Sequence, residues 1–153
     1  MKTLLLSIFL MMTVSTAYAN SCDTVDEHPS SGVFTQDCIS EILINYVTFH
    51  PNGYFIIEGP GDENIYVQGS RSTDNSFLLE AVGPQYSSKI TPEVVKALIS
   101  LGWALPGESG NFDLTIQVDQ IFNQDAASIL YTALYSYYPE ATDVDLSYQM
   151  SDF

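Results

Sequence analysis

The chain has 153 residues, with 19 Asp and Glu against 4 Lys and Arg and a formal net charge of -15. This length is typical of one domain, and a hydrophobic content of 46% is enough to build a core. So large an excess of negative charge repels phosphates, which argues against nucleic acid and anionic lipid as partners. We therefore expect a protein or peptide partner, either basic or uncharged.

The first 19 residues have the pattern of a secretory signal peptide. Lys2 precedes an apolar run from Leu4 to Val14, and Ala17-Tyr18-Ala19 has the small residues of a cleavage site. The run is much shorter than the roughly 20 residues that span a bilayer. We expect cleavage before Asn20 and a bacterial protein that is periplasmic or secreted. Cleavage leaves 19 acidic and three basic residues, a net charge of -16.

The two cysteines, Cys22 and Cys38, are expected to pair once the chain is exported. Such a disulfide would stabilise the fold by roughly 3 kcal/mol in the chain-entropy model. It would join the polar arm, residues 20–35, to the first predicted helix. A redox pair and a metal site are the alternatives, but the chain has no CxxC motif, and His28 and His50 lack ligand spacing.

The first half of the domain reads as one helix followed by three short strands. Apolar residues recur at helical spacing between Ile39 and Val47, ahead of the turn signal Pro51-Asn52-Gly53. Segments 54–58, 64–68 and 77–82 are rich in strand-forming residues and are separated by turns that contain Gly. Short strands separated by such turns predict an antiparallel meander.

The second half alternates helices and strands. Thr91 and Pro92 have the residue types of a helix cap and first turn, and Gly102 is placed to end that helix. Segments 112–119 and 143–150 alternate apolar with polar residues, which predicts half-buried strands. Between them, residues 122–137 carry a helical apolar stripe that ends at Pro139.

These elements predict an α+β fold with the order α-βββ-α-β-α-β. The sheet is expected to have five mostly antiparallel strands, with the helices packed on one face. The strict alternation of apolar and polar residues along the strands leaves the other face exposed to solvent. We expect a signal peptide at 1–19, the polar arm at 20–35 and a single domain at 36–153. Alternation places one set of residues on the open face: Tyr54, Ile56, Glu58, Tyr66, Gln68, Leu78, Glu80, Asp113, Thr115, Gln117, Asp145, Ser147 and Gln149.

Motifs for catalysis are missing from the sequence. It has no GxSxG, HExxH or EF-hand loop, so we expect no enzyme activity, no cofactor and no metal site. Glu58 and Glu80 fall on predicted strands and could act as an acid/base pair of the glycosidase type. In so acidic a chain, solvated charges on a strand face are the favoured reading of this pair.

Tyrosine is abundant, with 10 residues, and it suits contact surfaces because it offers a large area with few rotatable bonds. The open face therefore becomes the candidate ligand-binding surface. A solvated face with no partner is the alternative, and the tyrosines of the last helix are expected to pack in the core. The candidate ligand-binding residues are Tyr54, Tyr66, Gln68, Glu80, Asp113 and Gln117.

Several segments, taken in order, resemble the bacterial TY-Chap domains, which are similar to type III secretion chaperones and to the YbjN family. The segments are Tyr66-Val67-Gln68, Leu79-Glu80-Ala81-Val82, Ile90-Thr91-Pro92-Glu93, Leu101-Gly102-Trp103 with Pro106, and Asn111-Phe112. The resemblance spans about residues 54–138 and implies a chaperone-like α+β fold that binds a protein or peptide. Trp103, the single tryptophan, is expected to fill the core.

Two functions follow as hypotheses. The first is an exported, non-enzymatic protein- or peptide-binding module that resembles the secretion chaperones. The second is an acidic immunity or inhibitor protein that neutralises a basic toxin or enzyme, and it is motivated by the charge of the mature chain.

Overall fold

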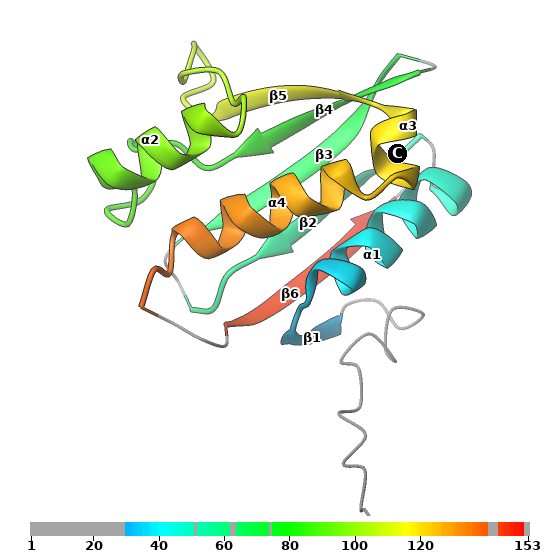
Figure 1. Ribbon diagram of the computed structural model, residues 1–153, viewed down its shortest axis with the longest axis horizontal. Coiled ribbons are helices and arrows are strands. Elements are labelled where there is room, and N and C mark those ends of the chain that lie inside the picture. The colour runs from blue at the N-terminus through cyan, green and yellow to red at the C-terminus, as the bar shows by residue number, and fades with distance from the viewer. Residues whose placement is uncertain (1–29, 51, 62–63, 74, 141–143, 152–153) are drawn as a thin grey trace, which may run out of the picture.

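The computed structural model describes residues 30–50, 52–61, 64–73, 75–140 and 144–151 (Figure 1). The expected signal peptide and Cys22 lie outside the described residues, so cleavage and the Cys22–Cys38 disulfide remain predictions. The elements, in chain order, are β1 (Ser30–Val33), α1 (Gln36–Phe49), β2 (Tyr54–Glu58), β3 (Tyr66–Thr73), β4 (Ser76–Ala81), α2 (Pro92–Ser100), β5 (Phe112–Gln117), α3 (Val118–Phe122), α4 (Asp125–Ser136) and β6 (Asp145–Ser151).

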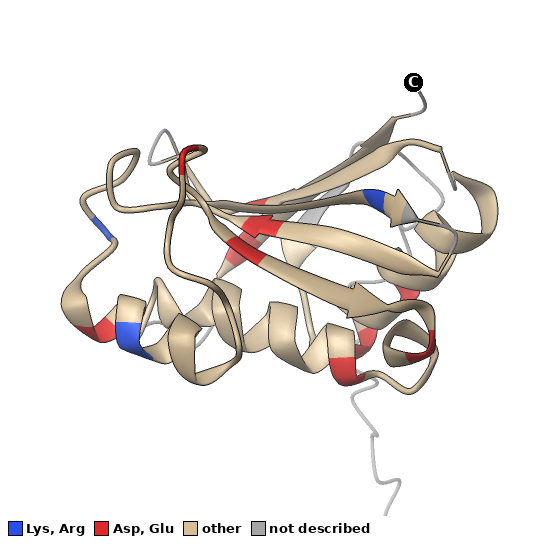
Figure 2. Cartoon of the chain, turned by 90° about the horizontal axis from the view of Figure 1, so that it is seen from above, with Lys and Arg blue, Asp and Glu red and all other residues tan. Residues whose placement is uncertain are grey.

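The strands form one antiparallel sheet in the order β1-β6-β2-β3-β4-β5. All of the helices lie on the same side of it, as the two perpendicular views show (Figures 1 and 2). This arrangement confirms the predicted α+β class with helices on one face.

The sheet has a sixth strand that the sequence pattern did not predict. β1 comes from the polar arm and pairs with β6, with Val33 opposite Asp145. The segment Ser30-Ser31-Gly32-Val33 has little strand propensity of its own. Pairing along the free edge of β6 stabilises it, which is a tertiary contact that local sequence does not encode.

Local sequence sets the helix boundaries. The side chains of Thr35 and Thr91 cap α1 and α2, accepting hydrogen bonds from the backbone N–H groups of Cys38 and Val94. The strand predicted at 112–119 ends at Gln117, because Val118 begins the short helix α3. The helix predicted at 122–137 begins at Asp125 as α4, and Gln124, which has a left-handed backbone (φ 68°), separates it from α3. A single left-handed residue interrupts a helix without disturbing its apolar stripe, so periodicity alone missed this break.

The core lies between the sheet and the helices. Tyr46 of α1 packs edge-on against Phe55 and Phe77, with ring centroids 5.1 and 5.6 Å apart. Its buried hydroxyl donates to the Gly53 carbonyl at 2.9 Å. Trp103 is only 2% exposed, as expected for the single tryptophan. Because α1 to α4 all pack on this side, the described part of the chain places no helix on the other side of the sheet.

None of the helices in the described part of the chain has both the length and the apolar character needed to span a membrane.

Candidate binding site on the open sheet face

The open face consists of the strand residues that point away from the helices. Along β2, the side chains alternate between partly buried and fully buried, as Phe55 and Ile57 enter the core while Tyr54 and Ile56 remain accessible. The expected set of open-face residues from Tyr54 to Gln149 is therefore placed as the alternation predicted. Figure 2 shows acidic positions close together on neighbouring strands of the sheet.

One row of side chains crosses four strands of this face. The strand register aligns Ile56 with Gln68, Gln68 with Glu80, and Glu80 with Asp113. The Gln68 Nε2 amide donates to Glu80 Oε2 at 2.8 Å. This bond satisfies one acceptor of Glu80 and fixes the side chain of Gln68 beside it.

Glu80 and Asp113 are like charges placed directly opposite one another. The backbone N–H of Ala104 donates to the Asp113 carbonyl at 2.8 Å from the outer side of β5, so Glu80 and Asp113 form a non-hydrogen-bonded strand pair. In such pairs the two side chains approach most closely. Desolvation and, after it, the negative charge of Glu80 raise the pKa of Asp113 above its usual value.

A shallow pocket of about 320 Å³ lies beside this row. Three of the predicted binding residues line it together, namely Tyr54, Gln68 and Glu80. Gly69 and Ser70 also line it and were not singled out from the sequence. The only available signal was that Ser70 follows Gln68 by two residues, which places it on the same face.

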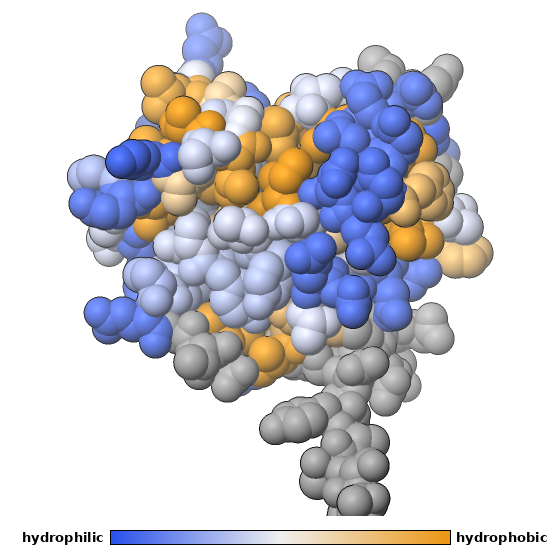
Figure 3. Space-filling model, in the orientation of Figure 1, coloured by the Kyte–Doolittle hydropathy of each residue, from blue (hydrophilic) through white to orange (hydrophobic). Residues whose placement is uncertain are grey.

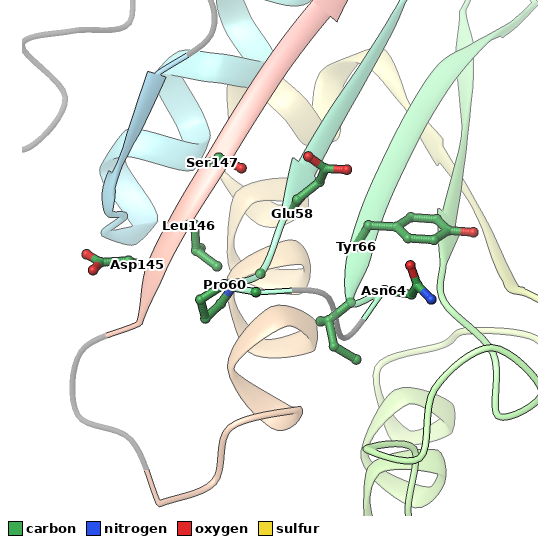
Figure 4. A pocket seen from close by; sticks show the side chains of 10 residues that line it. Glu58, Pro60, Asn64, Tyr66, Asp145, Leu146 and Ser147 are labelled. Carbon is green, nitrogen blue, oxygen red and sulfur yellow. The ribbon is translucent and has the colours of Figure 1, made fainter.

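A second pocket, of about 470 Å³, opens at the end of the same face (Figure 4). Tyr66 and Glu58 line it from neighbouring strands, and Asp145 and Ser147 line it from β6. All four residues were expected on the open face from the alternation of the strands, and only Tyr66 was predicted to bind a ligand. Beyond the end of β2, Pro60, Gly61 and Asn64 also line this pocket, and Asn64 has a left-handed backbone (φ 51°).

Asn111 fixes the position of Tyr66. Its Nδ2 donates to the Tyr66 hydroxyl at 3.0 Å, and its Oδ1 accepts from the backbone N–H of Gly83 at 3.3 Å. Asn111 is 7% exposed, so these bonds satisfy a largely buried amide. Tyr66 is therefore tied to the loops at the ends of β4 and β5, and its ring has a structural role in addition to any contact with a ligand.

The remaining predicted residue, Gln117, lies apart from both pockets. It pairs with Ser76 at the far end of β5 and is the residue before α3, where its backbone N–H donates to Gln120 Oε1 at 2.8 Å. Glu58 and Glu80 share the open face but belong to β2 and β4, with β3 between them. The face thus brings together five of the six predicted residues and separates Gln117 from them.

No basic residue occupies the open-face positions of the described strands. Arg71 points to the helix side, where its guanidinium lies 5.8 Å from the centre of the Phe77 ring, and Lys89 and Lys96 lie before and within α2. Glu58, Glu80, Asp113 and Asp145 therefore share this face without a positive side chain among them. The described residues also contain no cluster of three or more His, Cys, Asp or Glu that could hold a metal ion.

Comparison with family models, with curated proteins and with solved structures found no match to this chain.

Proposed function

We propose that the protein is an exported, non-enzymatic module that binds a protein or peptide through its open sheet face. The same class is implied by the resemblance of its sequence segments to the TY-Chap domains. The observation that carries the proposal is the composition of the uncovered face, on which Tyr54 and Ile56 lie beside the Gln68–Glu80–Asp113 row. Accessible apolar and aromatic area with a polar surround is typical of protein-recognition surfaces.

The broad face is a better binding surface than the outer edge of the sheet. On β5, the Asp113 carbonyl accepts from Ala104 and the Gln117 N–H donates to Gln120, so backbone groups at both ends of this edge are occupied. A partner strand adding here would have to compete with these bonds. Side chains of the face remain accessible without such a rearrangement.

The helix side is the competing surface. Figure 3 shows apolar side chains reaching the surface there, in the region between α2 and α3. Ile99 of α2 is 41% exposed, and Phe122 of α3 is 57% exposed. Single exposed apolar residues are normal on soluble proteins, so these positions serve best as matched controls.

The proposal is tested with a partner isolated from native cells, identified and purified. We expect Gln68→Ala to weaken its binding by at least fivefold in calorimetry, because a row in the centre of the contact would be disrupted. Ile99→Ala should leave the Kd unchanged. Weakening by Ile99→Ala but not by Gln68→Ala would move the site to the helices and refute the proposal. Circular dichroism verifies that both variants are folded.

A second candidate function is neutralisation of a basic toxin or enzyme. The like-charged Glu80–Asp113 pair favours it, because a cationic partner would relieve the repulsion between the two carboxylates. In this case the purified partner would be a folded enzyme whose own activity falls as the complex forms. A partner bound only as an extended or unfolded segment would exclude the inhibitor role and leave the chaperone-like one.

A further inference from the structure

We propose that the open face recognises an extended cationic segment of its partner, with two basic side chains about four residues apart that are held by two separate acidic positions. This inference rests on the proposed function, since it names the chemistry of the partner at the same face. The first position is the Glu80–Asp113 pair, and the second is Glu58 at the end of β2.

At the first position, two carboxylates repel each other, and a bound cation would reduce this repulsion. Glu80 and Asp113 are a non-hydrogen-bonded pair, and the field of Glu80 disfavours the charged form of Asp113. Among the described side chains, the neutral Gln68 amide donates a hydrogen bond to Glu80 at 2.8 Å. An ammonium or guanidinium group above the pair would interact favourably with both carboxylates at once.

The second position lies on the same face at a distance set by the strands. Glu58 is two strands away from Glu80 and two residues further along β2 than Ile56, which is in register with the Gln68–Glu80 row. With strands about 4.8 Å apart and a rise of about 3.3 Å per residue, the two backbone positions are about 12 Å apart. Asp145 lines the same pocket as Glu58 and adds to the negative charge there.

An extended chain matches this separation. Residues i and i+4 of a strand point to the same side and are about 13 Å apart, while i and i+3 point to opposite sides. The residue between the two basic ones, at i+2, would point to the same side and lie over the accessible row between the acidic positions. The midpoint between Glu80 and Glu58 falls over β3 between Gln68 and Tyr66, with Ile56 beside it on β2, so an apolar residue suits i+2.

The inference is tested by nuclear magnetic resonance with isotope-labelled protein and a capped heptapeptide, Thr-Lys-Thr-Val-Thr-Lys-Thr, whose lysines are four residues apart. We expect resonances of β2, β3, β4 and β5 open-face residues to shift, and a tenfold rise in salt to weaken the binding. A peptide with glutamates in place of the lysines should cause no such shifts. A third peptide, with lysines three residues apart, should bind more weakly than the first.

Charge-removing variants locate the contact. Glu80→Gln keeps an acceptor for the Gln68 amide, and it should weaken binding of the lysine peptide by roughly 1.5- to 5-fold, as should Glu58→Gln. Glu41→Gln removes the same charge from an exposed position of α1, on the other side of the sheet, and should have no effect beyond that of net charge.

The outcomes separate this inference from the proposed function. Shifts on the open face that are equal for lysine and glutamate peptides, or independent of salt, would overturn cation recognition and leave the face as the binding surface. No shift at a peptide concentration on the order of 1 mM, or equal effects of Glu41→Gln and Glu80→Gln, would also overturn it. The proposed function would fail separately, if the native partner bound the helix side.

Discussion

Glu80 and Asp113 lie opposite one another on β4 and β5, on the side of the sheet away from the described helices. Asp113 is partly desolvated, and the charge of Glu80 adds to that effect in raising its pKa. Like charges directly opposite each other on neighbouring strands destabilise a sheet. The free protein therefore retains an unfavourable interaction at the surface that we propose for binding.

Removing the charge of Asp113 should stabilise the free protein. We expect Asp113→Asn to raise the free energy of unfolding by roughly 0.2–1 kcal/mol at pH 7, the range for cross-strand pairs. Urea denaturation of the variant beside the unaltered protein measures the difference. Because the folded-state pKa is raised, the charged carboxylate costs stability above that pKa, and this cost disappears as the pH falls through it. The advantage of Asp113→Asn should therefore shrink in mildly acidic buffer; a constant advantage, or a loss of stability at pH 7, would contradict this account.

Phe77 and Leu78 are consecutive residues of β4 with opposite orientations. Phe77 is 1% exposed and contacts Tyr46, whereas Leu78 is on the open face and only partly buried. We expect Phe77→Ala to cost about 3–5 kcal/mol, as for buried aromatic residues in general. Leu78→Ala should cost about 1 kcal/mol or less. Equal losses in chemical denaturation would mean that both faces of the sheet are covered.

Gly83 is required where the loops at the ends of β4 and β5 approach each other. A Cβ atom at this position would collide with the carbonyl oxygen of Gly110, which is backbone and has little freedom to move. Gly83→Ala should lower the free energy of unfolding by about 1–3 kcal/mol or more. Gly107, in the same loop region, has open space around it, so Gly107→Ala should change stability by less than about 0.5 kcal/mol. Similar melting temperatures for the two variants would show that the loops do not pack in this way.

The expected export of the chain can be checked by mass spectrometry of protein from native cells. We predict a mature chain that begins at Asn20, with Cys22 and Cys38 joined and a mass lower by two hydrogens than that of the reduced chain. Cys38 is buried in the first turn of α1, where a disulfide would be protected from solvent. A chain that still begins at Met1 would rule out cleavage of the signal peptide. A mass that does not change on reduction would rule out the disulfide.

Periodicity predicted much of the fold because each strand has one covered face. In β2, the buried residues Phe55 and Ile57 alternate with the accessible residues Tyr54 and Ile56. Residues could therefore be assigned to the buried or the open face before the strand register was known. β1 was missed, since Ser30–Val33 is stabilised by pairing with β6 and not by its own propensity. The break at Gln124 was missed because a left-handed residue leaves no mark in the apolar pattern.

The candidate site was predicted less completely than the fold. Alternation places side chains on a face but contains no information on which strands become neighbours. For this reason Gln68, Glu80 and Asp113 were recognised as open-face residues, but their alignment in one row depends on the pairing of β3, β4 and β5. The same limit explains why Gln117 was grouped with them although it lies at the end of β5, next to α3.

Site-specific photo-crosslinking identifies which side of the sheet contacts the native partner. A photoreactive amino acid replaces Ile56, at the centre of the open face, or Ile99, which is 41% exposed on α2. In native cells, we expect a defined partner to be captured from position 56 and not from position 99. Capture from position 99 alone, or equally from both positions, would contradict it.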